Sequence, residues 1–349
     1  MRKRYFFIRT VLSISLIINI LFIFYSINGC KSYPFKQKWS SKYYTKTRSL
    51  IITADDYCCS ECIDSGSILG VKDGIINTLT AITTYPNAAS IIKSTKEKYP
   101  FVHIGIHLNI TTGFALSPKE KIPSLIDKDG QFYDITDELS RLDKISLNEV
   151  EIELRAQIEE FKKSGVEIDH LSYQHNLLAI YPPFYDIVIK LAKEYNVPVR
   201  NPVAISSIDK KTFPNAGTHK IAKMLATKLA VKHPFTALSL LKYTKIETML
   251  KNIKKLDSAK IKHPDYMIDY IYGNPTPENL LYILNNLPEG TSELIFHLGF
   301  GCDTDKGGKG VDSNYFPYRE METVLATSAF IKEYIKSKNI KIISFSDLE

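Results

Sequence analysis

From Ser49 to the carboxyl terminus, short apolar runs of strand length alternate with longer segments of helical period. Apolar residues recur on one face of the segments 147–163 and 185–195, which predicts a helix over each. Repeated strand, helix, strand order favours an α/β fold with a parallel sheet, either open or closed into a barrel. The expected strands are 50–54, 78–83, 102–110, 167–172, 197–200, 293–298 and 341–345.

The composition describes a globular protein with one unevenly charged stretch. With 349 residues, 44% of them hydrophobic and 24% charged, the chain can bury a large core, and a disordered protein is excluded. Residues 201–265 hold thirteen lysines and four acidic residues, so we expect a basic helical insertion at about 204–265 within a single domain, 49–349. Aromatic residues are sparse there, which favours a solvated face and no nucleic acid partner.

The amino terminus carries the pattern of an export signal or a membrane anchor. Four basic residues between Arg2 and Arg9 precede the uncharged apolar run 11–27. The end of this segment resembles a bacterial lipoprotein signal, in which Cys30 is diacylated after cleavage; without cleavage, the apolar helix itself would hold the protein. We therefore expect an exported, membrane-anchored protein with its signal or anchor in residues 1–30 and a polar linker over 31–48.

Two adjacent carboxylates, Asp55 and Asp56, end the first expected strand. Because neighbouring residues of a strand point to opposite sides, the two carboxylates can take different roles. One can ligate a cation while the other holds a water molecule beside it. Capping of the helix expected to begin near Ser60 is the alternative role for this acidic pair.

Three further segments carry histidines at or near strand ends. Alternation along 102–110 places His107 on a face poor in apolar side chains. His170 and His175 are five residues apart, so both can bind one ion only if the chain turns between them; we assign the ligand to His175 and a structural role to His170. His297 lies late in an apolar strand. Four separate elements that carry Asp and His side chains predict a metal site.

Several motifs occur in one order from about Ser49 to the end of the chain: TADDY, DGIINTLTAIT, GIHLNIT, the segment 170–175, VPVR, ENLLYILNNLPEGTSELIFHLG, YFPYREME and IKIISF. In these motifs the chain resembles the YdjC-like carbohydrate deacetylases. The resemblance implies a distorted (β/α) TIM-like barrel related to polysaccharide deacetylases. It also implies the removal of acetyl groups from N-acetylated amino sugars such as chitooligosaccharides, and a homodimer.

The resemblance also implies roles for individual residues. Asp55 would be the catalytic base, and one divalent metal ion, magnesium or zinc, would be held by Asp56, His107 and a histidine of the third motif, for which we choose His175. His297 would act later as an acid or as a substrate contact. Two imidazoles and one carboxylate leave coordination positions open, as a catalytic metal site requires.

The third motif departs from the family pattern. Family members read HIDSHQH or similar, and an alignment without a gap puts Gln174 at the first inner histidine and His175 one place later. The third ligand is therefore open between His170 and His175.

Two arginines complete the candidate site. Arg200 and Arg319 can orient carboxylates or bind sugar hydroxyls, with surface salt bridges as the alternative.

The cysteines permit one disulfide in an exported protein. It would join two of Cys58, Cys59, Cys62 and Cys302, and the sequence does not choose the pair.

Three hypotheses for the function follow. The first is a membrane-tethered, metal-dependent N-deacetylase of amino sugars. The second keeps the fold but makes the protein a catalytically weak sugar-binding lipoprotein, because the third motif is altered. The third is a metal-dependent hydrolase of other esters or phosphates, for which the basic stretch 201–265 is the hint.

Overall fold

A computed structural model describes residues 48–213, 217–240, 243, 245–301 and 315–349, which belong to one compact unit, Thr45–Glu349. Its centre is a seven-stranded sheet in the order β4-β3-β2-β1-β6-β5, with β7 paired to the start of β1, and each of these pairings is parallel. The predicted parallel α/β fold is confirmed. The strands are β1 (Arg48–Tyr57), β2 (Thr78–Ala81), β3 (His103–Leu108), β4 (Leu171–Tyr173), β5 (Tyr266–Ile268), β6 (Gly290–Phe296) and β7 (Lys341–Ile342).

The sheet curls into a half-barrel, and an irregular segment connects its two edges. The strand expected at 197–200 is absent; instead Val199 forms a single bridge with Leu171 of β4. Farther along, Ala204 forms a single bridge with Met267 of β5. The prediction of a regular strand at 197–200 is therefore wrong, although this segment occupies the position between the edge strands that a strand would fill.

Proline explains why this connection is irregular. Pro198 and Pro202 have no backbone N–H group, and a strand between two neighbours needs its N–H groups for the ladder. The sequence also did not predict β5, because its three residues, Tyr266–Ile268, are too few to show an alternating pattern.

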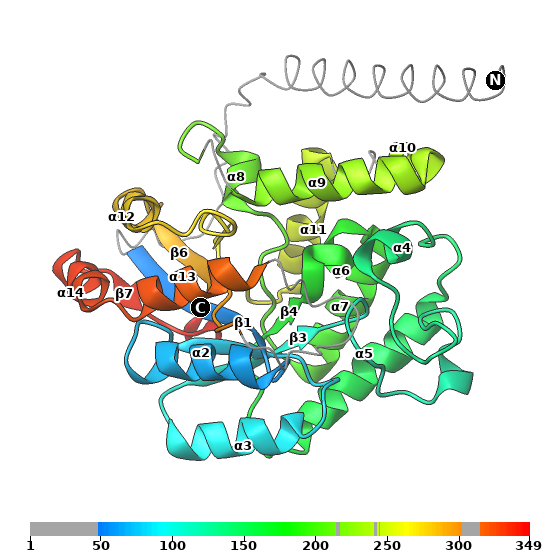
Figure 1. The fold of residues 1–349 in the computed structure, drawn as a ribbon, viewed down its shortest axis with the longest axis horizontal. Helices are drawn as coiled ribbons and strands as arrows, with labels where there is room; N and C mark the ends of the chain where they lie inside the picture. The colour runs from blue at the N-terminus through cyan, green and yellow to red at the C-terminus, as the bar shows by residue number, and fades with distance from the viewer. Residues whose placement is uncertain (1–47, 214–216, 241–242, 244, 302–314) are drawn as a thin grey trace. The chain divides into compact units, whose positions relative to one another are not determined.

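Helices pack outside the sheet, and α5 lies against both α3 and α7 (Figure 1). The helices predicted at 147–163 and 185–195 are present as α5 and α7, and the helix predicted near Ser60 begins one residue later as α2, with the Ser60 hydroxyl capping it. The basic stretch forms α8 to α11. The helices are α2 (Glu61–Lys72), α3 (Ala88–Lys98), α4 (Ile135–Leu139), α5 (Leu147–Lys162), α6 (Leu177–Ile180), α7 (Pro182–Tyr195), α8 (Ile205–Ile208), α9 (Gly217–Lys232), α10 (Pro234–Leu240), α11 (Ile246–Ala259), α12 (Pro277–Asn285), α13 (Phe316–Ala326) and α14 (Ala329–Ser337), with short 3-10 turns η1 (Lys119–Lys121), η2 (Gln174–Asn176) and η4 (Phe345–Asp347).

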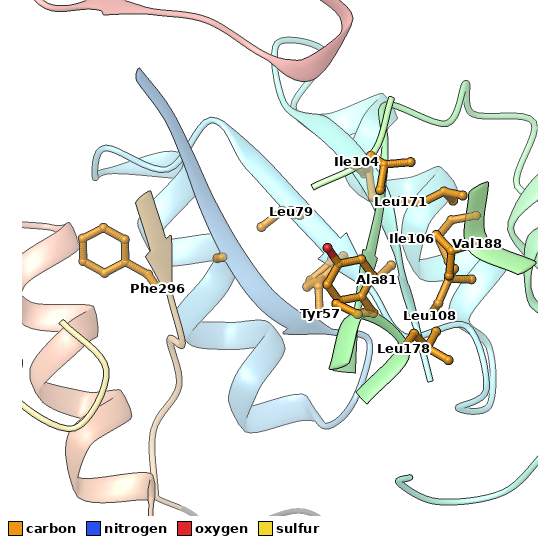
Figure 2. Packing of buried hydrophobic residues seen from close by; sticks show 14 of the residues in the cluster. Tyr57, Leu79, Ala81, Ile104, Ile106, Leu108, Leu171, Leu178, Val188 and Phe296 are labelled. Atoms are coloured by element: carbon orange, nitrogen blue, oxygen red, sulfur yellow. The ribbon is translucent and has the colours of Figure 1, made fainter. Parts of the chain in front are cut away.

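One side of β3 faces the main apolar core. Ile106 and Leu108 are fully buried and gather with Leu171 and Val188 of the neighbouring elements (Figure 2). Each fully buried aliphatic side chain contributes about 1.5–3 kcal/mol to folding. The alternation of these residues along β3 therefore fixes which of its side chains face the opposite side of the sheet, among them His107.

At the start of β4, the interior is closed by the carboxyl-terminal turn. The ring of His170 is fully buried and stacks on Phe345 of η4, with 3.8 Å between ring centroids. A Cβ atom at Gly105 would lie 2.3 Å from His170 Nδ1, so only glycine leaves room for this ring. His170 thus packs within the fold, in contact with Asp169 rather than with the acidic pair of β1.

The amino-terminal expectations lie outside the described residues. The apolar run 11–27, Cys30 and nearly all of the linker 31–48 fall in the part of the chain that is not described. Within the described ranges, no helix is long and apolar enough to cross a bilayer. Membrane attachment therefore stays a prediction from the sequence.

Cysteine pairing is partly decided. Cys62 is disulfide-bonded, whereas Cys58 and Cys59 are free and buried, so neither of them is its partner. Cys302 lies outside the described residues.

Asp169 fastens the carboxyl-terminal turn to the sheet. Its Oδ1 accepts hydrogen bonds from the backbone N–H of Ser346 at 3.2 Å and from the Ser346 hydroxyl at 2.9 Å, and its Oδ2 contacts His170 Nδ1 at 3.0 Å. Burial opposes ionisation of this carboxyl, but the hydrogen bonds with His103 and His170 outweigh burial and hold its pKa well below the usual range.

We predict that Asp169→Asn lowers the free energy of unfolding at pH 7 by about 1–3 kcal/mol, because the turn loses a charged acceptor. The folded-state pKa of Asp169 lies below the unfolded value of about 3.9, so the carboxylate stabilises the fold at neutral pH. This contribution is lost as the pH falls below about 4 toward the folded pKa. Urea unfolding of both proteins at pH 7 and pH 3 should therefore show the difference shrinking in acid. The exposed control Asp129→Asn should stay within about 0.5 kcal/mol of the wild type.

Candidate active site

The predicted acidic pair and two of the predicted histidines meet at the carboxyl ends of the strands. His107 Nε2 lies 3.9 Å from Asp55 Oδ2 and 3.8 Å from Asp56 Oδ1. His297, directly after β6, places Nε2 4.0 Å from Asp55 Oδ2. Side chains far apart in the sequence thus share one site, at the end of the strands where parallel α/β proteins place their chemistry.

Both carboxylates face this site because β1 is irregular at its end. The register between β1 and β2 shifts between Ala54 and Tyr57, and Asp56 adopts a left-handed backbone conformation with φ of 70°. The expectation that Asp55 and Asp56 point to opposite sides of a regular strand is therefore wrong. The bulge turns Asp56 back, so that both carboxylates approach His107.

Asp55 is held by a paired set of hydrogen bonds. Arg200 Nη1 and Nη2 donate to its two oxygens, each at 2.7 Å, and the Thr80 hydroxyl donates to Oδ1 at 2.9 Å. Burial opposes ionisation of Asp55, but the Arg200 charge outweighs burial and holds the Asp55 pKa well below its usual range. Asp55 is therefore an ionised carboxylate of fixed orientation.

Arg200 is shared between Asp55 and Glu293 of β6. Its Nε lies 3.1 Å from both Glu293 oxygens, and its Nη2 lies 2.7 Å from Oε1. Arg200 is 1% exposed and Glu293 is fully buried, so the surface salt bridge considered for Arg200 is excluded. Arg200 orients a carboxylate, as the sequence analysis allowed.

Among the described residues, one carboxylate oxygen of Asp56 accepts a hydrogen bond and the other, called its open oxygen below, does not. Arg319 Nη2 of α13 donates to Oδ2, whereas Oδ1 has no hydrogen-bond partner among the described residues. The Asp56 side chain is nearly fully buried, and burial opposes its ionisation, but the Arg319 charge outweighs burial and lowers the Asp56 pKa to about 2. The site therefore contains a buried negative oxygen that faces His107 without a donor.

His107 is fixed on both ring nitrogens. Nδ1 lies 2.7 Å from the hydroxyl of Ser172, and Nε2 lies 2.6 Å from Gln174 Oε1. Burial is the main reason that the His107 pKa is lowered, so this imidazole is neutral at neutral pH. A neutral imidazole is the form that binds a metal ion.

His297 forms the more exposed side of the site, with one fifth of its side chain accessible. Its backbone N–H donates to Glu322 Oε2 at 2.5 Å, and its ring lies beside Tyr272, with 4.7 Å between centroids. Burial is the main cause that lowers the His297 pKa to about 4, so the ring is neutral at neutral pH. Burial also raises the pKa of Glu322 to about 8.

His175 occupies a sharp turn after β4. It lies in η2 with a left-handed φ of 53°, and its Nδ1 shares a hydrogen bond of 2.9 Å with the Thr111 hydroxyl. In the described ranges, no group of three or more His, Cys, Asp or Glu side chains could hold a metal ion. The predicted set of Asp56, His107 and His175 is therefore not assembled as a complete set of ligands, although its first two members lie together.

The site also contains residues that the sequence analysis did not assign. Glu293 had a signal in the sequence, because an acidic residue inside an apolar strand requires a buried partner. The other three side chains are ordinary polar residues whose roles depend on spatial neighbours. The four residues missed are Thr80, Ser172, Glu293 and Glu322.

A curled parallel sheet with carboxylates and neutral imidazoles at the carboxyl ends of its strands defines an α/β protein with an acid–base centre. The model of the YdjC-like protein family matches residues 49–337, and the chain belongs to this family. The resemblance noted from the sequence motifs is thereby confirmed.

Curated relatives and a solved structure agree with this assignment. A carbohydrate deacetylase of Enterococcus faecalis is 34% identical over 170 residues, which cover 48% of this chain and 62% of the relative. A carbohydrate deacetylase of Thermoanaerobacter pseudethanolicus is 25% identical over 300 residues, which cover 86% of this chain and 99% of the relative. A protein of Enterococcus faecalis, described as a putative cellobiose-phosphate cleavage protein, has a crystal structure similar to this one, with a TM-score of 0.67 and 25% sequence identity. The match covers 86% of this chain and 98% of the Enterococcus chain.

We predict that Arg200→Ala lowers the free energy of unfolding by about 3–5 kcal/mol, because it leaves two buried carboxylates without their shared cation. The control is Arg155→Ala, which removes an arginine that also contacts two carboxylates but on the surface. Its expected cost is about 0–1 kcal/mol. Chemical unfolding of both variants measures the difference, and equal losses would contradict the importance of the buried triad.

Proposed function

We propose that this protein is a metal-dependent carbohydrate deacetylase that hydrolyses the acetamide of N-acetylated amino sugars such as chitooligosaccharides, within a distorted (β/α) TIM-like barrel. The names of the relatives support the reaction class. The observation that carries the proposal is the ionised Asp55 beside the open oxygen of Asp56, with His107 Nε2 within 4 Å of both carboxylates. Amide hydrolysis needs a base beside a positive group that stabilises the developing oxyanion. Asp55 fits the first role, and a cation at the open Asp56 oxygen would fill the second.

Asp55 is the group that accepts a proton from the attacking water. Arg200 keeps the carboxylate ionised and fixes the direction of its oxygens. Glu293 shares the same guanidinium, so Arg200 is itself held in place from the other side.

Asp56 and His107 fit the role of cation ligands. Asp56 Oδ1 is buried, negative and without a partner among the described residues, and His107 is a neutral imidazole beside it. When bound, a divalent cation would supply Lewis-acid polarisation of the acetyl carbonyl. Arg319 would hold the second Asp56 oxygen, and so keep Oδ1 directed into the site.

His297 is placed to serve the leaving group. It is the accessible member of the site, and its Nε2 lies 4.0 Å from Asp55 Oδ2. The neutral ring must first accept a proton before it can donate one. The proton taken by Asp55 can reach His297 Nε2 through one bridging water molecule, and His297 can then donate it to the departing sugar amine.

The cellular setting is proposed from the sequence alone. Basic residues followed by the apolar run 11–27 support export and attachment to a membrane, through a lipid on Cys30 or through the uncleaved helix. The substrate would then be an acetylated oligosaccharide outside the cytoplasm. A homodimer is the expected assembly.

We predict that Asp55→Asn lowers turnover by about 10²–10⁴-fold, because general base catalysis contributes a factor of this size. Acetate release from N-acetylglucosamine oligomers, in buffer with added Mg²⁺ or Zn²⁺, is the measurement. Asp73→Asn is the matched control, since Asp73 is an exposed residue at the end of α2. Wild-type protein that binds these oligomers and releases no acetate would favour a sugar-binding role, and faster hydrolysis of phosphate or other ester substrates would favour another hydrolase.

We predict that Cys30→Ser abolishes labelling of the full chain by a radioactive fatty acid in bacterial cells, because the thiol is the acylation site of a lipoprotein signal. The control is Cys59→Ser, which removes a buried free thiol. An unlabelled wild-type chain that still sediments with membranes would assign the attachment to the apolar helix instead.

A further inference from the structure

We propose that the outer face of α9 and α10 is a docking surface for a membrane that contains anionic phospholipid, so that the folded domain contacts the bilayer directly. The two helices lie at the edge of the domain opposite α3 (Figure 1). The proposal goes beyond the proposed function, because it concerns neither the reaction nor the amino-terminal segment that would tether the chain.

The two helices form an almost continuous helix. The backbone N–H of His233, which lies between them, donates to the Leu229 carbonyl oxygen at 2.7 Å, and the N–H of Ala237 donates to the His233 carbonyl oxygen at 2.9 Å. Both bonds join residues four apart, as in an α-helix, so the helical phase of α9 continues into α10. Residues three or four positions apart therefore share a face across the junction.

One face of this helix pair belongs to the domain. Leu229 and Leu240 are both buried in the main core. At the junction, side-chain nitrogens of Lys232 and His233 lie 3.5 Å and 3.7 Å from Asp137 Oδ1 of α4. These contacts fix which face of the pair points outward.

The outward face carries large apolar side chains. Val231 is 79% exposed, Phe235 is 88% exposed and Leu238 is 61% exposed. Their spacing of four and then three residues places them in one apolar stripe along the helix pair. Single exposed apolar side chains are ordinary on a protein surface, whereas a continuous group of large ones marks a surface that binds something.

Lysines border this apolar stripe on both sides. With about 3.6 residues per turn, Lys228 and Lys232 lie to one side of the stripe and Lys223 lies to the other, and all three are exposed. The surrounding sequence, 210–246, holds eight lysines and no acidic residue. Apolar side chains flanked by lysines are typical of a helix that lies in the interface of an anionic bilayer, where the ammonium groups reach the phosphates.

An anionic membrane fits this face better than the other possible occupants. A nucleic acid would attract the lysines but would leave the apolar stripe without a partner. A second copy of the chain, paired through the same face, would bring lysines against lysines. A bilayer accommodates both features, and the sequence independently predicts a bilayer nearby through the apolar run 11–27. Docking would then add a second signal to the tether, as stable attachment of a lipidated protein requires.

The test places one fluorescent side chain in the apolar stripe. Phe235→Trp is made in the full chain with Trp39→Phe, so that the introduced tryptophan is the only one. The protein is reconstituted with vesicles of equal parts phosphatidylglycerol and phosphatidylcholine that carry brominated acyl chains. Bromine quenches tryptophan at close contact, so the emission should fall at least twofold and shift to shorter wavelength.

Phe101→Trp in the same background is the matched control. Phe101 is also well exposed, but it follows α3, which lies at the opposite edge of the domain (Figure 1). Its emission should not change when the brominated vesicles are added, because a membrane that contacts α9 and α10 would not reach it.

The contribution of charge is measured in the Phe235→Trp protein. Vesicles of pure phosphatidylcholine, or added salt, should reduce the quenching at least threefold, because salt screens exposed charges. The double change Lys223→Glu and Lys228→Glu should have the same effect. The matched pair Lys93→Glu and Lys98→Glu, on α3, alters the net charge equally and should leave the quenching unchanged.

Three results would overturn the proposal. The first is an absence of quenching in Phe235→Trp with anionic vesicles, and the second is equal quenching in Phe235→Trp and Phe101→Trp. The third is a shift of the Phe235→Trp emission that depends on protein concentration and needs no lipid, which would assign the face to a second copy of the chain.

The same proteins separate this proposal from the proposed function. Quenching in a Phe235→Trp protein that releases no acetate, from a wild type that also releases none, would support docking and contradict the deacetylase assignment. Acetate release by the wild type, with no quenching in Phe235→Trp, would do the reverse.

Discussion

The buried triad of Asp55, Arg200 and Glu293 is the interaction on which the rest of the structure depends. Each of these ions would cost several kcal/mol to bury alone, and only their mutual hydrogen bonds offset that cost. Asp55 belongs to β1, Glu293 to β6, and Arg200 to the segment that connects the edges of the sheet. The direction of the proposed base and the closure of the half-barrel therefore depend on the same three side chains.

The second constraint is the irregular end of β1. A left-handed backbone at a non-glycine residue is uncommon, and Asp56 and the nearby Cys58 both adopt one. Such conformations persist where the surroundings over-determine them, and here Arg319 holds the Asp56 side chain. A regular strand would have directed Asp56 away from His107.

Much of the fold and part of the site could be predicted from the sequence. Long apolar runs located six of the seven strands, although β4 and β7 have shifted or shorter bounds than predicted, and helical periodicity located α5 and α7. Adjacent polar residues at strand ends located Asp55, Asp56, His107 and His297. Such patterns succeed because they follow from the geometry of single elements.

The rest depends on contacts between elements, which a linear pattern does not contain. The bulge of β1 reverses the direction that regular alternation gives to Asp56. The left-handed backbone at His175 and Asn176 directs His175 to the Thr111 hydroxyl, while Gln174 contacts His107. The isolated bridge at Val199 likewise replaces a strand because neighbouring prolines interrupt the ladder.

The stacking of Phe345 on His170 has a consequence for the order of folding. The hydrogen bond beside this stack joins Asp169 and Ser346, which are 177 positions apart in the sequence. Such non-local contacts contribute only after the entropic cost of closing a long loop has been met. The turn Phe345–Asp347 is therefore expected to order late, after the neighbouring strands have paired.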